Sequence, residues 1–232
     1  MKILAADCCT SSGSVALLDG EQVVAEWTFV SPETHNRRLL KTIGFLLNEI
    51  GWSLHDVDAY AVTRGPGSFT GLRIGLTTMK TLAWSTGKPF VGVPSLDALA
   101  APLATGSLPI CTLLDAKKQE LYFGFFLPDG RGQATLAKPY RLLPVRGVSE
   151  HIAAPAIFCG NGCPLYRDTL QSSLGNRFLE APAPFHLIRA SFVGQIALTR
   201  LLRGETDDPM TSVPLYVRPS EAELKRPQSA RS

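Results

Sequence analysis

The glycine-rich run from Arg64 to Gly75 is the part of the sequence whose residue types most readily suggest ligand chemistry. It follows an apolar, strand-like segment over residues 59–63 and leads into a helix-like segment that ends at about residue 86. A glycine-rich turn between a strand and a helix allows backbone N–H groups to come close to an anion or to another chain. The run is therefore tested first as a phosphate-binding loop.

Neither common phosphate-binding pattern fits this run. A P-loop has Lys and then Ser or Thr after its last glycine, whereas Leu72 and Arg73 follow Gly71 here. The dinucleotide-binding pattern has its third glycine three residues after the second, where this chain has Thr70. The spacing argues against both kinds of nucleotide site.

Nucleophile and zinc patterns are also incomplete. Ser68 lacks the flanking glycines of a nucleophile elbow, so Ser68 or Thr70 is better predicted as a helix N-cap. Cys159 and Cys163 lie four residues apart, but no second pair of ligands completes a zinc set. No histidine lies within four residues of another. The sequence predicts no catalytic residue and no metal ligand.

The bulk composition indicates a soluble globular protein. Of its 232 residues, 45% are hydrophobic and 19% charged, and the net charge of +3 is too small to indicate a nucleic-acid surface by itself. The longest uncharged run, residues 98–114, is too short and too interrupted by prolines to span a membrane. No export signal is visible, and the five cysteines are an odd number, so we expect reduced thiols and a cytoplasmic location.

Apolar runs and turn signals predict an α/β protein. Strands are expected at residues 3–6, 14–18, 22–29, 59–63, 90–93, 109–114, 121–126 and 156–159, helices at 35–50, 68–86, 95–103, 164–174 and 191–203, and an extended tail at 214–224.

One pattern occurs twice: a strand ending in Asp, a turn, a second strand and Asp-Gly, with Asp7 and Gly20 in the first copy and Asp115 and Gly130 in the second. Two hairpins can resemble each other by chance, because strands commonly end in Asp-Gly. The alternative is a duplicated α/β unit whose hairpins face each other across a cleft. We predict one lobe over residues 1–104, a second over 105–224 and a flexible tail over 225–232, and leave open whether helix 191–203 packs back on the first lobe.

Five segments of the chain together resemble the bacterial TsaB family, also known as YeaZ, of tRNA threonylcarbamoyladenosine biosynthesis proteins. They are residues 3–7, 14–18, 35–40, 64–75 and 214–219, and the glycine-rich run is the most specific of them. The resemblance extends over nearly the whole chain. It implies the duplicated actin-like (ribonuclease-H-like) ATPase fold with two lobes, which agrees with the repeated hairpin.

What the resemblance implies for function is a non-catalytic subunit. Members of the family pair with TsaD, a catalytic relative of the same fold, and with TsaE, a small ATPase. Together these proteins modify adenosine 37 in tRNAs that read codons beginning with A. The chain is then expected to reach tRNA through the complex and to form a homodimer when alone. The rival hypothesis is an actin-like enzyme acting alone, either a small-molecule kinase or a metallohydrolase.

The sequence departs from the catalytic relative at the metal site. That relative carries a His-x-x-x-His pair after a Gly-Val dipeptide, and two histidines at this spacing share one helix face. Here Gly92 and Val93 are followed by Ser95 and Leu99 at the two histidine positions. Leucine cannot bind a metal, so we predict that this metal site is lost.

A nucleotide site is predicted only weakly. Enzymes of this fold place a glycine two residues after the strand-end Asp, which lets the turn wrap around phosphates. Both turns of this chain keep the Asp and lack the glycine, so capping of the strand ends is the alternative. We expect no tightly bound cofactor and leave open weak ATP or ADP binding, by this chain or at a complex interface. The residues of this possible site are Asp7, Thr10, Asp115 and Lys117.

The predicted partner surface lies on helices 35–50 and 68–86. The first helix carries more apolar residues than one stripe requires, and the second has small residues four apart on one face, which allows close helix packing. Its residues Leu72, Leu76, Met79 and Ala83 are expected to face the core. The alternative is that both faces of each helix are buried inside the chain's own lobe. The residues predicted to contact a TsaD-like partner are Leu39, Ile43, Leu46, Gly71, Gly75, Thr78 and Leu82.

Overall fold

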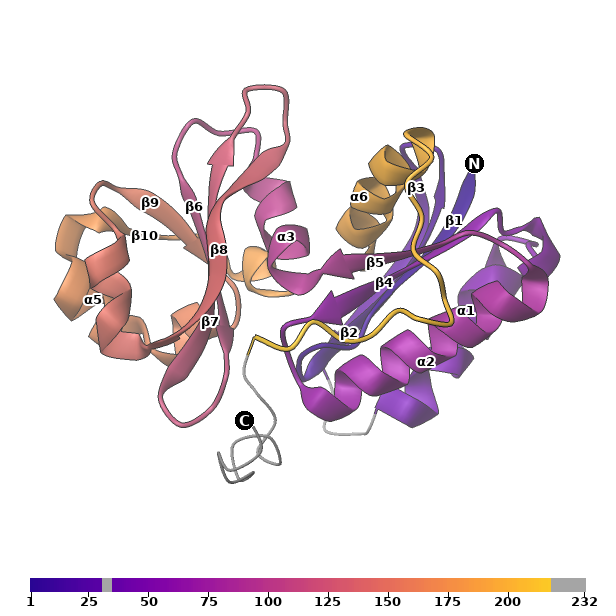
Figure 1. The fold of residues 1–232 in the computed structure, drawn as a ribbon, viewed down its shortest axis with the longest axis horizontal. Coiled ribbons are helices and arrows are strands. Elements are labelled where there is room, and N and C mark those ends of the chain that lie inside the picture. The colour runs from indigo at the N-terminus through magenta and orange to yellow at the C-terminus, as the bar shows by residue number, and fades with distance from the viewer. Residues whose placement is uncertain (31–34, 218–232) are drawn as a thin grey trace, which may run out of the picture.

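Two five-stranded mixed sheets with the same connectivity form the frame of the molecule (Figure 1). The computed structural model describes residues 1–30 and 35–217. The first sheet has the order β3-β2-β1-β4-β5 and the second the order β10-β9-β6-β7-β8. The strands are β1 (Lys2–Asp7), β2 (Ser12–Asp19), β3 (Gln22–Val30), β4 (Ala59–Gly65), β5 (Phe90–Pro94), β6 (Ile110–Asp115), β7 (Glu120–Pro128), β8 (Ala134–Pro144), β9 (Ala156–Cys159) and β10 (Phe178–Glu180).

The repeated hairpin is therefore a real duplication. In each sheet three antiparallel strands come first and two parallel strands complete the other side, joined by helices. A chance resemblance of two hairpins would not reproduce the strand order of a whole sheet.

Six α-helices connect and cover the sheets in the part of the chain that the structure describes. The predicted helix 164–174 is in fact two helices, interrupted at Tyr166, and the predicted helix 95–103 leaves α geometry after Ala100, next to Pro102. The α-helices are α1 (His35–Glu49), α2 (Phe69–Thr86), α3 (Ser95–Ala100), α4 (Gly162–Leu165), α5 (Arg167–Leu174) and α6 (Ala190–Leu202), and the 3₁₀ helices are η1 (Leu54–Asp56), η2 (Ala101–Leu103), η3 (Val145–His151), η4 (Gly175–Arg177) and η5 (Ala183–His186).

Two strands escaped the sequence prediction, and both lie at the edges of the second sheet. β8 contains Pro139 and its side chains are mostly exposed, so it lacks the apolar run that marks a central strand. β10 has only three residues. Edge strands of this kind acquire their conformation from pairing with a neighbour.

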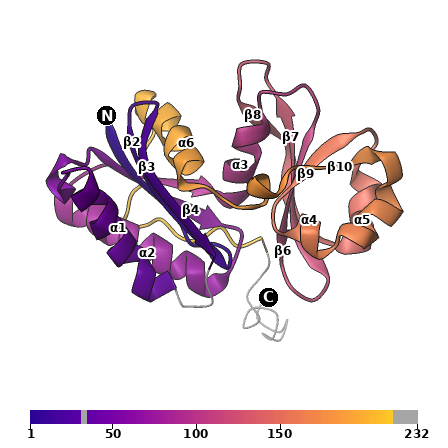
Figure 2. The same cartoon turned by 180° about the vertical axis from the view of Figure 1, so that it is seen from behind.

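Each lobe receives one central helix from the other half of the chain. α6, near the end of the chain, packs on β1 and β2, and α3, which follows the first sheet, packs on β6 and β7. Figure 2 shows both helices between the two sheets. Gly194 permits this packing, because a Cβ there would collide with the Leu18 side chain. The second half of the chain thus completes the core of the first.

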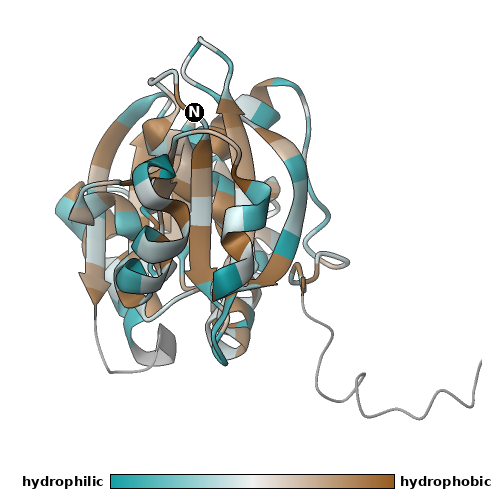
Figure 3. Cartoon of the chain, turned by 90° about the vertical axis from the view of Figure 1, so that its left-hand side faces the viewer, coloured by the Kyte–Doolittle hydropathy of each residue, from teal (hydrophilic) through white to brown (hydrophobic). Residues whose placement is uncertain are grey.

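The core has two apolar layers around the first sheet. α1 and α2 cover one face with a buried stripe, whereas α6 and α3 cover the opposite face and continue into the core of the second lobe. Figure 3, viewed from the side of the second lobe, shows brown, apolar strands flanked by helices on which brown and teal alternate. The four residues of α2 predicted to face the core, Leu72, Leu76, Met79 and Ala83, are buried, which confirms that prediction.

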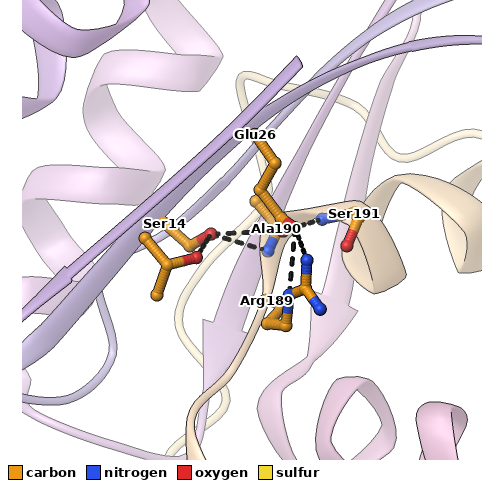
Figure 4. Close-up of polar contacts among 6 residues, drawn as sticks. Ser14, Glu26, Arg189, Ala190 and Ser191 are labelled. Atoms are coloured by element: carbon orange, nitrogen blue, oxygen red, sulfur yellow. Dashed lines mark hydrogen bonds and ion pairs between the residues drawn. The ribbon is translucent and has the colours of Figure 1, made fainter. Parts of the chain in front are cut away.

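The start of α6 is bound to the first sheet by polar contacts (Figure 4). Glu26, whose side chain is 6% exposed, accepts a hydrogen bond from the Ser191 amide at 2.9 Å and forms an ion pair with Arg189. The Ala190 amide donates to the Ser14 hydroxyl at 2.9 Å. A helix begins with N–H groups that lack helical partners. β2 and β3 therefore supply acceptors for the first amides of α6.

The chain after α6 runs back along the first lobe as a segment we call the strap, residues 205–217. Asp207 forms a bridge with Phe90 at the edge of β5. Farther along, Lys80 donates to the Ser212 carbonyl at 2.7 Å and the Leu215 amide donates to the Arg64 carbonyl at 2.7 Å. Residues 214–217 of the predicted tail belong to no sheet. Residues 218–224 and the predicted flexible tail 225–232 lie outside the described residues.

Candidate functional site

The glycine turn is packed against the chain itself. A Cβ at Gly67 would collide with the Cys9 carbonyl oxygen, and a Cβ at Gly65, whose φ is +116°, would lie 2.6 Å from the Leu215 carbonyl oxygen. The Ser68 amide donates to that same Cys9 carbonyl at 2.7 Å. The glycines therefore allow the turn to lie against the β1–β2 turn and the strap.

Two predictions for the helix after this turn have opposite outcomes. Ser68 is the N-cap of α2 and accepts a hydrogen bond from the Gly71 amide at 3.3 Å, which confirms the capping prediction. Gly75, however, does not thin the helix for a neighbouring chain. A Cβ there would lie 3.3 Å from the Cys8 Cβ and 3.5 Å from a Val62 methyl group. Its small size serves packing within the first lobe.

The first strand-end carboxylate, Asp7, is fully buried. Its Oδ1 accepts hydrogen bonds from the Thr63 hydroxyl at 2.6 Å and from the Cys9 amide at 3.1 Å. Burial, and then the charge of Asp7, raises the pKa values of the Cys8 and Cys9 thiols above their ordinary range, so neither is an activated nucleophile. Thr10 Oγ1 is 2.7 Å from the Ser12 hydroxyl in the same turn. These contacts are those of a capped turn.

The second carboxylate, Asp115, is held by its own turn. Its Oδ2 forms an ion pair with Lys117 Nζ at 2.7 Å, and its Oδ1 accepts from the Lys117 amide at 2.9 Å and from the Tyr166 hydroxyl at 3.3 Å. The hydrogen bond from Lys117 to Asp115 raises the pKa of Lys117. Lys117, Lys118 and Gln119 all have left-handed backbone angles, with φ of 63°, 55° and 59°. The residues that donate the hydrogen bonds described for Asp7 all belong to the first lobe, and those that donate to Asp115 all belong to the second.

The duplicated fold raises the question of a nucleotide between these two turns. The residues present do not fit one well. Asp7 has no exposed surface with which to approach a metal-bound phosphate, and Asp115 is already paired with Lys117. Within the described residues, no three His, Cys, Asp or Glu side chains group as metal ligands.

The structure places most of the predicted partner-binding residues inside the first lobe. Five of them, Leu39, Ile43, Leu46, Gly71 and Gly75, are buried inside the first lobe. The three α1 side chains belong to the apolar layer between α1 and the sheet, so they offer no surface to another chain in this conformation. Thr78 and Leu82 are half-buried on α2.

Other residues of the same two helices are exposed and apolar. Leu40 and Phe45 on α1 have 57% and 45% of their surface exposed, and Phe69 and Trp84 are exposed on α2. Sequence reasoning missed Leu40 and Phe45, although helical spacing contained the signal. Leu39, Ile43 and Leu46 follow the spacing of one core-facing stripe, and apolar residues off that stripe are the ones left for solvent or a partner.

Comparison with known proteins agrees with this architecture. A family model described as "TsaD: tRNA N6-adenosine threonylcarbamoyltransferase" matches residues 29–225. The Bacillus subtilis tRNA threonylcarbamoyladenosine biosynthesis protein TsaB is 30% identical over 97% of this chain and 97% of its own length. The chain belongs to the TsaB family. The resemblance read from the sequence is therefore confirmed.

Solved structures confirm the predicted fold class. A Pseudomonas aeruginosa protein, described as similar to peptidase YEAZ, has a TM-score of 0.79 at 30% identity, over 94% of this chain and 99% of its own. The Acidaminococcus fermentans (R)-2-hydroxyglutaryl-CoA dehydratase component A has a TM-score of 0.52 at 10% identity, over 87% of this chain and 99% of its own, which shows a shared fold alone. The fold is the duplicated actin-like α/β fold with two lobes. No helix in the described part of this TsaB-family chain is long and apolar enough to cross a membrane.

Proposed function

We propose that this chain is a non-catalytic subunit required for the threonylcarbamoyl modification of adenosine 37 in tRNAs that read codons beginning with A. In this proposal it binds and supports a TsaD-like catalytic protein of the same fold. A TsaE-like ATPase and the tRNA join through the complex, which operates in the cytoplasm. When alone, the chain pairs with a second copy through the same surface. Membership of the TsaB family supports this assignment.

The observation that carries the docking proposal is the exposed apolar surface of α1. Leu40 and Phe45 project from a helix whose other apolar residues already fill the core beneath it. Gly44 lies between them, and a Cβ built there would have no atom within 4 Å, so this part of the helix presents little steric obstruction to a neighbour. Burial of one large apolar side chain contributes about 1.5–3 kcal/mol, so a partner that covers both gains appreciable affinity.

The partner proposal is strengthened by how α1 lies in the fold. α1 contacts α2 on the outer face of the first sheet, away from the second lobe (Figure 1). A partner of the same fold has two corresponding helices, and two helix pairs can pack as a four-helix contact with apolar ridges in grooves. Leu82 on α2, which is half-buried, contributes to the same contact.

The turns after Asp7 and Asp115 give no support to the idea that this chain catalyses a reaction by itself. Their carboxylates are engaged by Thr63 and by Lys117, which is what strand-end capping requires. We therefore assign the chain no tightly bound cofactor. Any binding of ATP or ADP is weak, or uses groups from the partner.

The docking surface can be tested with one matched pair of variants. Leu40→Asp is expected to abolish co-purification with the TsaD-like protein, because it places a charge at the centre of an apolar contact. Leu165→Asp is the control, since Leu165 has the same 57% exposure but lies on the second lobe. Circular dichroism verifies that both variants fold. Unchanged binding of Leu40→Asp, or equal loss with Leu165→Asp, contradicts the docking surface.

Reconstitution separates the proposed role from the rival enzyme. Modification of tRNA by the TsaD-like and TsaE-like proteins is expected only when this chain is added, and Leu40→Asp is expected to fail in its place. A chain that hydrolyses ATP or phosphorylates a small molecule by itself, at a rate unaffected by the partner, would support the lone enzyme instead.

A further inference from the structure

A cavity of about 580 Å³ lies between the lobes. It is at the end of the molecule opposite the two turns that follow Asp7 and Asp115, which we call the Asp turns. Its walls include Glu21 in the β2–β3 turn and Arg131 in the β7–β8 connection. The Asp turns are at the other ends of these hairpins, since Asp7 ends β1 and Asp115 precedes β7. At about 3.3 Å per strand residue, the cavity is about 20 Å from Asp7. The cavity is therefore distinct from the nucleotide site predicted from the sequence.

Three arginines from separate parts of the chain line this cavity. Arg200 on α6 is fixed in the wall, because it donates to Asp207 at 3.1 Å and 3.2 Å and to the Gly92 carbonyl at 3.1 Å. Arg131 and Arg203 are exposed, and no ion pair is described for either within residues 1–30 and 38–217. A guanidinium group offers paired N–H donors that match the oxygens of a phosphate or a carboxylate.

The wall of the cavity also holds a carboxylate that can accept a further hydrogen bond. Asp97 on α3 is half-buried and accepts one from the Tyr140 hydroxyl through Oδ1. No donor to its Oδ2 is described among the residues that the structure covers. Burial raises the pKa of Asp97 to about 6, as expected for a carboxyl group with few donors. Thr199 and Gln195 add uncharged polar groups to the same wall.

We propose that this cavity binds a small hydroxylated oxyanion, such as a sugar phosphate or a hydroxy acid. Arg131 and Arg203 hold the phosphate or carboxylate at the mouth, and Asp97 accepts a hydrogen bond from a hydroxyl group. The volume is in the range of pockets that enclose small organic ligands, which is more than an inorganic phosphate alone would fill. Because its walls come from both lobes, a bound ligand also fixes their relative position.

The experiment is isothermal titration calorimetry of the isolated full chain with two probes, ribose 5-phosphate and citrate, at matched ionic strength. Saturable binding is expected for the probe whose oxyanion fits the site. Binding of ribose 5-phosphate would identify that oxyanion as a phosphate, and binding of citrate would identify it as a carboxylate. Arg131→Gln and Arg203→Gln are each expected to weaken binding about tenfold or more, because each removes a hydrogen bond to a charged group. Asp97→Asn is expected to weaken binding of whichever of these two probes binds, because both carry hydroxyl groups. It is not expected to weaken binding of inorganic phosphate, which is titrated separately as a control.

Two matched variants locate the site. Arg146→Gln removes an exposed arginine from η3, outside the cavity, and Lys117→Gln removes a cation at the β6–β7 turn; both are expected to bind like the wild type. Loss of binding in Lys117→Gln, unchanged binding in both cavity variants, or no saturable binding of either probe would each overturn the proposal. Co-purification with the TsaD-like protein is not part of this assay, so its outcome is independent of the docking role.

Discussion

Replacement of Glu26 by Ala should be among the most costly single changes outside the apolar core. Glu26 supplies the acceptor for the Ser191 amide at the start of α6. An orphaned buried donor costs about 1–3 kcal/mol, and loss of a negative charge at a helix N-terminus costs about 0.3–1 kcal/mol. The Arg189 ion pair adds little, because that guanidinium is half-exposed. The expected loss in the free energy of unfolding is therefore about 1–4 kcal/mol.

Equilibrium unfolding in urea, followed by circular dichroism, measures this loss. Glu26→Gln keeps an oxygen acceptor and should lose about 1 kcal/mol, and Arg189→Ala should lose less than about 1 kcal/mol. Glu49→Ala is the matched control, since Glu49 is exposed at the end of α1 and surface changes usually stay within about 0.5 kcal/mol. A Glu26→Ala cost below about 1 kcal/mol, or an equal cost for Arg189→Ala, would refute the reasoning that the buried acceptor anchors α6.

Two glycines should respond in opposite directions. Gly44→Ala, with open space around it, should raise the free energy of unfolding by about 0.5–1 kcal/mol, whereas Gly67→Ala should lower it by about 1–3 kcal/mol, because its Cβ would collide with the Cys9 carbonyl oxygen. Urea unfolding checks both variants, and destabilisation by Gly44→Ala or none by Gly67→Ala would contradict the packing. Because the pKa of Asp97 is raised, the folded state binds more protons than the unfolded state between about pH 4 and 6. The contribution of Asp97 to the free energy of unfolding therefore falls as pH rises through that window, by up to about 3 kcal/mol. Asp97→Asn should therefore be more stable than the wild type at pH 8 and no more stable near pH 4, and a difference independent of pH would exclude this cause.

The order of elements was accessible from the sequence because the signals are local. Apolar runs that end in Asp, turns with Asp-Gly and a serine before a helix are each read from a few residues, and most elements lie within a few residues of their predicted bounds. β8 was missed because its conformation depends on pairing with β7, and its own residues include Pro139. Edge strands depend on partners far away in the sequence.

The sites were harder to predict, because the direction in which a residue faces depends on the whole fold. Spacing identified the glycine turn as a close-approach element, but only the structure shows that the approaching groups are the Cys9 and Leu215 carbonyls. Likewise, the apolar set of α1 could be seen in the sequence, but its division into buried Leu39 and exposed Leu40 follows from where the sheet lies. The cavity lined by Arg131 and Asp97 brings together distant segments, and no local pattern marks it.

The exchange of central helices has a consequence for how the protein is made. On the ribosome, β1 to β5 emerge early, but α6, which covers the inner face of that sheet, emerges only after Leu202, about 100 residues beyond Pro94. At about 5–20 residues per second, the nascent first half waits for about 5–20 s with an uncovered apolar face. A truncated product that stops before α6 would keep that face, and so would be a substrate for chaperones or proteases. The order of the sequence thus makes the synthesis of α6 the step that completes the core of the first lobe.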